Sequence, residues 1–462
     1  MTLLAHGIDF GTSNSAIASV HLESGEIVFS SSRAANNSNE GFNQYLVPSN
    51  FYFDRSRQRL VGWPGLSQFA TLASAKTKCS DCDRSKFRIN GDIDWNRLCN
   101  YASKREGCFD SRLAHAVKTE LASEKLINTH SWGDNYSSID FVAGVMSELV
   151  ADANRAHGLK SGSVKKVVLG YPIVFPGAEG EDSSILERNA IEILKEAATK
   201  VGFREIAFLD EGSASNYGMN IRSGRCISLD FGAGTFDVAT ALKEIDDKTT
   251  VLSSHGADIG GNKIDEMLFE LFLSQRMGLG SRIKKIPPLY VSQRTANLLM
   301  NLRNYTRALH LPDVLSEIQI ASTKPGGEPL MEAASLLSSG QGILVYQAIQ
   351  KAKIELSKNF RSEIKYQLPG LAPISVPIDR EALDGVVNSV LPLVEKAIGQ
   401  SLLDSNWEYS EVDFVLMTGG SSQLQRFRER MNELFPNAKF VDSDPFLTVV
   451  RGLGLRAREL WM

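Results

Sequence analysis

The motif that decides the fold occurs twice, first as Gly7-Ile8-Asp9-Phe10-Gly11-Thr12-Ser13-Asn14 and again, near the middle of the chain, as Ser228-Leu229-Asp230-Phe231-Gly232-Ala233-Gly234-Thr235. Each copy places an apolar run before Asp-Phe-Gly, then glycine or hydroxyl residues, then alternating residues that suit a returning strand. Each copy therefore predicts a β-hairpin with a tight, polar tip. Because the second copy begins near mid-chain, we expect two similar lobes that face each other across a cleft.

The tips of the two predicted hairpins carry three kinds of residue that suit a nucleoside triphosphate. Glycines let backbone N–H groups converge on an anion, hydroxyls donate further hydrogen bonds, and carboxylates hold the water shell of Mg²⁺. The glycines are Gly11, Gly232 and Gly234, the hydroxyl residues are Thr12, Ser13 and Thr235, and the carboxylates are Asp9, Asp230 and Asp237. A single Asp-x-Gly turn often serves only to cap a hairpin. Two such turns in the same strand frame favour a nucleotide site.

Predicted helices and strands alternate between the two motifs. Apolar spacing predicts helices over Ile139–His157 and from Ser184 to Gly202, each followed by a strand, at Val164–Leu169 and Ile206–Leu209. This β-α-β order places Glu211 beyond the carboxyl end of a strand, where ligands of α/β sheets bind. A structural role is the alternative, since a glutamate also stabilises the start of a following helix.

Two glycine-containing segments in the second half could also approach a ligand closely. Gly260-Gly261 ends a loop before an amphipathic helix, and Gly419-Gly420-Ser421 follows a strand predicted at Phe414–Met417. Such positions let a phosphate or a flat ring reach the backbone, although they also occur as plain strand-to-helix turns.

Length and composition set the broad class. The chain has 462 residues, 43% hydrophobic content and a net charge of −4, which indicates a globular protein of two domains without the basic surface that nucleic-acid binding needs. No apolar run reaches the roughly 18 residues of a spanning helix, and the first residues lack a basic leader. We therefore expect a cytoplasmic protein that binds neither nucleic acid nor membrane.

The predicted lobes cover residues 1–222 and 223–462, and a polar region with proline breakers predicts a peripheral subdomain at about residues 262–365. The first lobe contains an insertion at about residues 76–111 with four cysteines, Cys79, Cys82, Cys99 and Cys108. The Cys-x2-Cys spacing fits half of a structural zinc site, whereas the second pair is wide. Free thiols in a reducing compartment are the alternative.

Several blocks in family order resemble the ATPase domain of the heat shock protein 70 chaperones, within the superfamily that also holds actin and hexokinase. Besides the two motifs, the blocks are Leu169-Gly170-Tyr171-Pro172, Asp210-Glu211-Gly212-Ser213-Ala214, Ala352-Lys353-Ile354-Glu355-Leu356-Ser357 and Gly419-Gly420-Ser421. The similarity is greatest to the short YegD-like branch. It implies an α/β, actin-like ATPase fold, in which two duplicated ribonuclease H-like lobes with mixed sheets, flanked by helices, enclose a nucleotide cleft.

The resemblance also implies roles for individual residues. Phosphates would be held by Thr12, Ser13, Asn14, Gly232, Gly234, Thr235 and Gly261, and hydrated Mg²⁺ by Asp9 and Asp230. Glu211, Thr235 and Asp237 would position the attacking water, while Lys353, Ser357, Gly419, Gly420 and Ser421 would line the adenosine pocket. Pro172 would lie in a relay between the cleft and the outer surface. The implied activity is slow hydrolysis of ATP to ADP and phosphate, in a nucleotide switch read by protein clients or co-chaperones.

Two departures from the family pattern stand out. Gln350 replaces a glutamate of the adenosine pocket, and Gln423 replaces an arginine that stacks on adenine. The lysine that polarises the γ-phosphate matches Lys118 best, with Lys76 and Lys78 as competitors. We also expect no peptide-binding domain, because the sequence stops where the family's ATPase domain ends.

Three other functions use the same clamp. A small-molecule kinase would need a carboxylate base in a sugar-like pocket, and the Ala-Lys-Ile-Glu-Leu-Ser string argues against it. A non-catalytic nucleotide-sensing scaffold is favoured by Gln350 and Gln423. Filament formation has no sequence signal.

Overall fold

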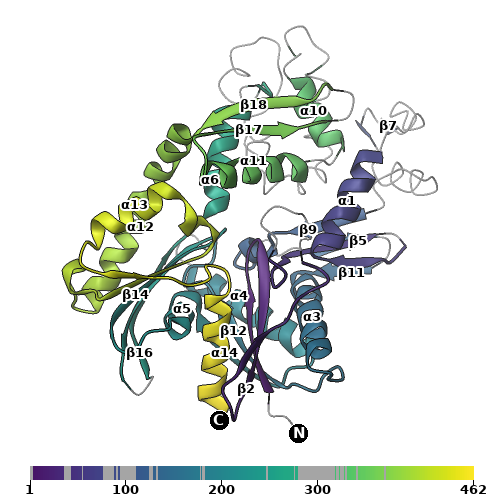
Figure 1. Cartoon of the computed structure of the whole chain (residues 1–462). Coiled ribbons are helices and arrows are strands. Elements are labelled where there is room, and N and C mark those ends of the chain that lie inside the picture. Colours follow the sequence, from purple (N-terminus) through teal and green to yellow (C-terminus); the bar gives the residue numbers. More distant parts are fainter. Residues whose placement is uncertain are drawn as a thin grey trace.

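Two mixed β-sheets lie side by side in the structure, a computed structural model (Figure 1). It describes residues 4–35, 43–54, 56–75, 88–89, 92–93, 111–123, 128–131, 134–176, 178, 183–245, 248–274, 276–278, 318, 322, 327, 330–339, 342–368 and 371–462. None of the helices in these ranges is both long and apolar enough to cross a membrane.

The two central sheets have the same strand order and the same strand directions. The first sheet runs β3 (Ile27–Phe29), β2 (Asn14–His21), β1 (Leu4–Phe10), β12 (Lys166–Tyr171), β13 (Glu205–Asp210), and the second runs β16 (Thr249–Ala257), β15 (Phe236–Lys243), β14 (Gly224–Phe231), β19 (Phe414–Thr418), β20 (Lys439–Val441). In each sheet the first three strands are antiparallel and the last three are parallel. Both predicted hairpins are therefore confirmed, and each opens one copy of a duplicated topology.

Helices α3 (Ser138–Ala156) and α4 (Ser183–Val201) pack together against the first sheet. A capping box starts α3, because Ser137 accepts from the backbone N–H of Asp140 while the Asp140 carboxylate accepts from that of Ser137. The predicted start of α4 at Ser184 was wrong by one residue, since Ser184 lies inside the first turn.

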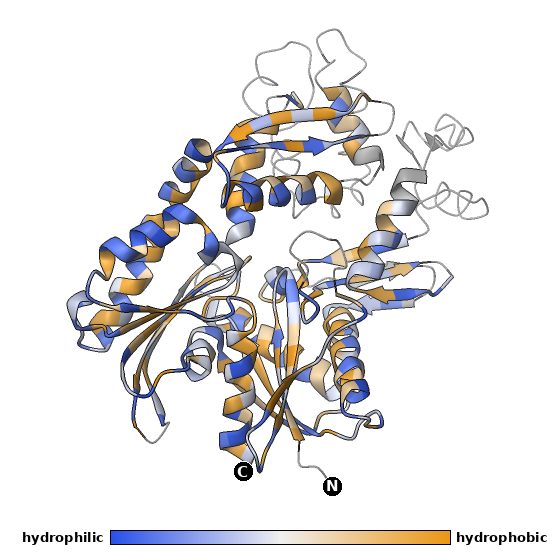
Figure 2. Ribbon diagram, viewed as in Figure 1, coloured by the Kyte–Doolittle hydropathy of each residue, from blue (hydrophilic) through white to orange (hydrophobic). Residues whose placement is uncertain are grey.

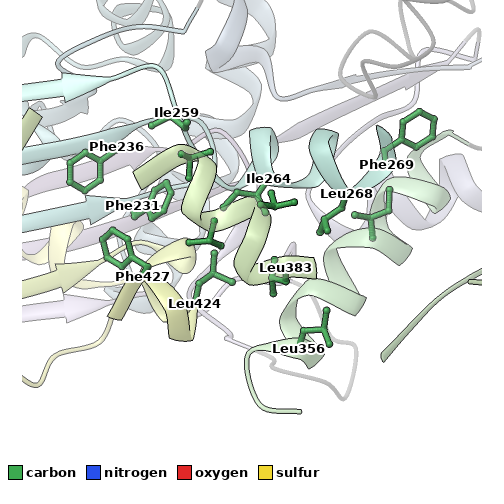
Figure 3. Packing of buried hydrophobic residues seen from close by; sticks show 14 of the residues in the cluster. Phe231, Phe236, Ile259, Ile264, Leu268, Phe269, Leu356, Leu383, Leu424 and Phe427 are labelled. Carbon is green, nitrogen blue, oxygen red and sulfur yellow. The ribbon is translucent and has the colours of Figure 1, made fainter. Parts of the chain in front are cut away.

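The second sheet is covered by α6 (Gly261–Phe269), α12 (Arg380–Asp404) and α13 (Gln425–Leu434). Figure 3 shows Phe231 and Phe236 of this sheet beside Phe427 of α13, and Ile264 and Leu268 of α6 continuing the cluster towards Phe269. The strands of both central sheets are largely hydrophobic, whereas the helices around them carry hydrophilic residues on one side (Figure 2). Burial of these apolar faces is the main source of stability for each sheet.

Two helices join the halves of the molecule. Helix α5 (Glu211–Gly218) packs on β14 and β15 of the second sheet, and α14 (Thr448–Trp461) packs on α5 and on β1, β2 and β12 of the first sheet (Figure 1). A Cβ atom on Gly452 would lie 1.7 Å from the carbonyl oxygen of Ala214, so α14 and α5 touch backbone to backbone. The last helix thus completes the layer next to the first strand.

Two groups of elements outside the central sheets contact each other. On one side lie β5 (Asn50–Asp54), β6 (Arg59–Val61), α1 (Trp63–Ala75) and β9 (Ser111–His115), and on the other α10 (Leu330–Ser339), α11 (Gly342–Leu356), β17 (Arg361–Tyr366) and β18 (Ile374–Asp379). Ile343 of α11 packs on the cluster that contains Tyr52 and Leu113. The rings of His115 and Tyr346 are 5.9 Å apart, edge to face.

The remaining elements are short. They are β4 (Val47–Pro48), β7 (Arg88–Ile89), β8 (Asp92–Ile93), β10 (Asn128–Ser131), β11 (Asp134–Ser137), the 3-10 helices η2 (Val117–Glu120), η6 (Tyr409–Glu411) and η7 (Gly420–Gln423), and the π-helical turn η3 (Glu270–Ser274).

Candidate nucleotide site

The tips of the two repeated hairpins face each other. A Cβ atom on Gly234 would lie 2.5 Å from Oγ1 of Thr12, so the second turn touches the first only because residue 234 is a glycine. Gly11 is just as constrained, since its Cβ would lie 2.1 Å from the carbonyl oxygen of Asn14. The backbone N–H of Gly232 donates to the carbonyl of Thr235 at 3.0 Å and closes the second turn. The repeated motifs therefore form two walls of one site.

Four carboxylates crowd beneath these turns. Asp9 is the last but one residue of β1, Asp230 is the last but one of β14, Asp237 is the second residue of β15, and Glu211 begins α5. Burial and then the charge of Glu211 raise the pKa of Asp9 to about 7, and the same causes hold the pKa values of Asp230 and Asp237 well above the usual range. Buried acids in this number favour binding of a cation.

Lys118 supplies one cation to this cluster. Its side chain is 3% exposed and its ammonium group contacts the Glu211 carboxylate directly. It lies in η2, directly after Ala116, whose φ of 53° turns the chain at the end of β9. Burial alone would lower the pKa of Lys118, but the charges of Glu211 and Asp9 outweigh burial and raise it. Lys118 is therefore charged at neutral pH, whereas its competitors Lys76 and Lys78 lie outside the described residues.

Asp237 links the second turn to the first sheet. One carboxylate oxygen accepts from the hydroxyl of Thr235 at 2.8 Å, and the other accepts from the backbone N–H of Ile173 at 2.7 Å. Ile173 directly follows Pro172, at the end of β12. The hydroxyl of Thr235, the acid and the segment around Pro172 thus form one hydrogen-bonded chain between the halves.

Two polar atoms of the first turn are left for a ligand. Among the described residues, Asp9 Oδ1 and Ser13 Oγ are buried without a hydrogen-bond partner, and such orphaned atoms are rare in folded proteins. In the same ranges, no three His, Cys, Asp or Glu side chains form a direct metal cage. Mg²⁺ usually keeps several waters and takes only one or two carboxylates from the protein, so the arrangement of Asp9 and Asp230 fits a hydrated ion.

A second group of predicted residues gathers beside Gly232. The hydroxyl of Ser421 donates to the carbonyl of Gly232 at 2.9 Å, and the backbone N–H of Gly261 donates to the same oxygen at 3.0 Å. Lys353 of α11 donates to the carbonyl of Gly261 at 3.1 Å and pairs with Asp265 at 2.8 Å. Gly260 belongs to the same place, because its Cβ would lie 2.4 Å from the carbonyl oxygen of Ala233.

Gly419, with φ at 79°, lies against Asp230, since a Cβ there would be 2.5 Å from Asp230 Oδ1. Gly420 instead faces Phe446. Ser357 is bonded locally, to the carbonyl of Ile354. Asn14 is exposed at the start of β2, and its backbone pairs with Pro48.

The two glutamines that depart from the family pattern have partners of their own. Gln350 donates to the hydroxyl of Tyr346 at 2.8 Å, and that hydroxyl contacts Asn262. Gln423 donates to the hydroxyl of Ser422 at 3.1 Å.

Sequence reasoning missed two contributors to the site. The partner of Lys353 is Asp265, four residues after Gly261 on α6, and the partner of Asp237 is a backbone N–H. Asp265 could have been recognised from its position one helical turn after Gly261, on the same face of α6. The backbone donor at Ile173 has no side-chain signal.

Comparison with known proteins decides the family. The family model described as Hsp70 protein matches residues 5–283 and 343–457, which is most of the chain. This protein belongs to the Hsp70 family. Its actin-like ATPase fold, predicted from the resemblance, is confirmed by the match and agrees with the duplicated sheets.

Relatives of this Hsp70 protein are distant. It is 22% identical over 466 residues to a mitochondrial heat shock 70 kDa protein of Solanum tuberosum, covering 97% of this chain and 54% of that protein. It is 22% identical over 466 residues to the chaperone protein dnaK of Guillardia theta, covering 98% and 59%, and 24% identical over 462 residues to a chaperone protein HscA homolog of Haemophilus influenzae, covering 98% and 57%.

The Hsp70 chain thus spans a little more than half the length of these relatives. Its place in the YegD-like branch stays a prediction. So does zinc binding, because Cys79, Cys82, Cys99 and Cys108 lie outside the described residues.

Proposed function

We propose that this Hsp70-family protein is a slow, Mg²⁺-dependent ATPase whose nucleotide state changes the arrangement of its two halves. One observation carries the proposal. The charged Lys118 is buried against Glu211 beneath two glycine-rich turns that face each other and leave Asp9 and Ser13 atoms unpaired. Phosphoryl transfer from ATP to water requires hydrogen-bond donors for the phosphates, a fixed cation beside them and acids for a hydrated metal.

The position of each residue suggests its role. Backbone N–H groups and hydroxyls of Thr12, Ser13 and Thr235 would hold phosphate oxygens, and Lys118 would stabilise the negative charge that spreads over the transferring group. Asp9 and Asp230 would hold Mg²⁺, which neutralises phosphate charge when bound. Glu211 and Asp237 would orient the attacking water, and Asp237 already accepts a hydrogen bond from the hydroxyl of Thr235.

The chain of hydrogen bonds from Thr235 through Asp237 to Ile173 supports a switch. A change at the phosphates would move Thr235, and Asp237 would transmit that shift to the segment around Pro172 in the other half. The relatives are named as chaperones and heat shock proteins, which supports a chaperone-like role read by clients or co-chaperones. We propose that the protein acts in the cytoplasm.

Phosphate release from Mg²⁺-ATP by the purified chain tests the proposal. We expect slow turnover that stops when EDTA removes the metal. Thr235→Val, which keeps the shape but loses the hydroxyl, should turn over at least about tenfold more slowly with ATP affinity nearly unchanged, because the group acts mainly in the transition state. Thr235→Ser, which keeps the hydroxyl, is the matched control.

Each alternative has its own outcome in this assay. Tight ATP binding with no phosphate release over hours would instead indicate a nucleotide-sensing scaffold. Appearance of a phosphorylated metabolite without free phosphate would indicate a kinase. Equal turnover of wild type and Thr235→Val would refute the role of that hydroxyl.

A further inference from the structure

Phe446 is a large aromatic side chain left partly uncovered next to the nucleotide site. It lies between β20 and α14 and is 39% exposed. Its ring faces Gly420, where a Cβ atom would lie 3.2 Å from Cε1 and 3.8 Å from Cζ. Because Gly420 has no side chain, nothing from that residue covers the ring.

The backbone that carries this ring is held firmly. The Asp444 carboxylate accepts from the backbone N–H groups of Phe446 at 2.8 Å and Leu447 at 3.1 Å. The backbone N–H of Gly419 donates to the carbonyl of Pro445 at 2.7 Å. An aromatic ring on a fixed backbone loses little conformational entropy when a ligand packs on it.

The ring also adjoins residues that contact the second turn. Gly419 contacts Asp230, Ser421 donates to the carbonyl of Gly232, and Gly420 stands between them with Phe446 beside it. Lys353 approaches the same place, since its ammonium would be 3.2 Å from a Cβ on Gly261. Phe446 is thus one residue contact away from the loop that touches Asp230 and Gly232, and it is available to the rest of a nucleotide whose phosphates lie on the turns.

No cation is available for stacking from residue 423, because Gln423 stands there and donates to Ser422. We propose that Phe446 is the surface on which the purine base of the nucleotide stacks, in place of a stacking arginine. This inference rests on the proposed nucleotide site and adds how the base is held. Stacking on an aromatic ring recognises the π face of a base rather than its edges, so Phe446 contributes to affinity for the base and not for the phosphates.

The test separates the base from the phosphates by using two probes with the whole chain. Calorimetry would measure binding of Mg²⁺-ATP and of Mg²⁺ with inorganic tripolyphosphate, which has no base. Phe446→Leu keeps an apolar side chain of similar size without the ring. It should weaken ATP binding at least about fivefold and leave tripolyphosphate binding within about twofold of wild type.

Two further variants serve as controls for this test. Phe446→Trp keeps a ring, so it should retain ATP binding. Compared with wild type, which already has five tryptophans, it should show additional quenching of indole fluorescence by ATP and none by tripolyphosphate. Leu393→Ala removes another exposed hydrophobic side chain, on α12, and should bind both probes as wild type does.

The outcomes distinguish this inference from the function on which it rests. Equal ATP affinity in wild type and Phe446→Leu would overturn the stacking role alone. Equal loss of both probes in Phe446→Leu and Phe446→Trp would also overturn it, because a base-specific contact cannot act on tripolyphosphate. Failure of wild type to bind either probe would overturn the nucleotide site itself.

Discussion

The ammonium group of Lys118 and the carboxylate of Glu211 are in direct contact although the two residues are 93 positions apart in the chain. Both side chains are buried, and Asp9 and Asp237 lie near enough to act on the charge of Lys118. The pair therefore does two things at once. It makes burial of Glu211 tolerable, and it holds a cation where phosphoryl charge would develop.

Breaking this pair should cost stability in a non-additive way. Lys118→Met leaves Glu211 unpaired among other acids, so we expect the free energy of unfolding to fall by about 3–5 kcal/mol. The double variant Lys118→Met with Glu211→Gln should lose less than the sum of the single variants by at least about 1 kcal/mol. Urea unfolding of the four proteins checks this, and strictly additive losses would contradict the interaction.

Loss of Lys118 should also affect turnover more than binding. The lysine would act on charge that appears during transfer, so we expect Lys118→Met to hydrolyse ATP about 100-fold more slowly or worse. Single-turnover phosphate release is measured about 10 °C below the unfolding transition of the variant, so that no unfolded protein contributes to the rate. A rate within threefold of wild type, about 0.7 kcal/mol in the barrier, would exclude Lys118 from this role.

Adding one methyl group between the two turns should impair nucleotide binding. In Gly234→Ala the new Cβ would meet Thr12 Oγ1 at 2.5 Å, so the Thr12 side chain or the turn must shift. ATP affinity should fall at least about tenfold, an order of magnitude typical of a displaced binding group. Gly385→Ala is the matched control, because nothing lies within 4 Å of its Cβ on α12. That variant should bind ATP normally and gain about 0.5–1 kcal/mol of stability. Equal affinities of the two variants would mean that the turns need not touch.

Acidification should destabilise the protein through His6. This fully buried side chain has its pKa lowered from 6.5 to about 3 by burial and by His157. Because the folded state resists protonation, His6 contributes no penalty above pH 6.5, and stability is lost as pH falls from 6.5 towards 3. His6→Asn, which keeps a polar group for Ser19, should lose about 2 kcal/mol less than wild type between pH 7.5 and 5. Parallel losses in urea titrations at both pH values would contradict this assignment.

Asp9 should behave in the opposite sense in the metal-free protein. Its pKa is raised from 3.8 to about 7, so the unfolded state ionises first and the stability contributed by protonated Asp9 disappears as pH rises from about 4 through 7. In EDTA, Asp9→Asn should therefore be more stable than wild type at pH 8, by an amount on the order of 2–4 kcal/mol, and the gap should close near pH 4. Thermal unfolding across that range measures the gap, and a constant difference would contradict the prediction.

The sequence revealed the parts of this molecule whose signals are local. Each hairpin is predicted by one apolar run, one tight turn and one returning run, and α3 is predicted by its apolar spacing. The contact of Lys118 with Glu211, the pairing of Lys353 with Asp265 and the bond from Ile173 to Asp237 depend on how distant segments pack. No short-range pattern encodes them. Phe446 was missed for the same reason, because its value as a surface comes from a glycine 26 positions earlier in the chain.

Helix α14 has a consequence for the order in which the molecule is assembled. The ribosome makes β1 early, yet Val449, Leu453 and Ala457, which cover Ala5 on that strand, are made hundreds of residues later. Until then one apolar face of the first sheet is exposed to solvent, and such a surface favours aggregation with other nascent chains. Closing such a long loop is also slow. A protein of a chaperone family is thus built so that one face of its own first sheet stays uncovered until α14 has been made.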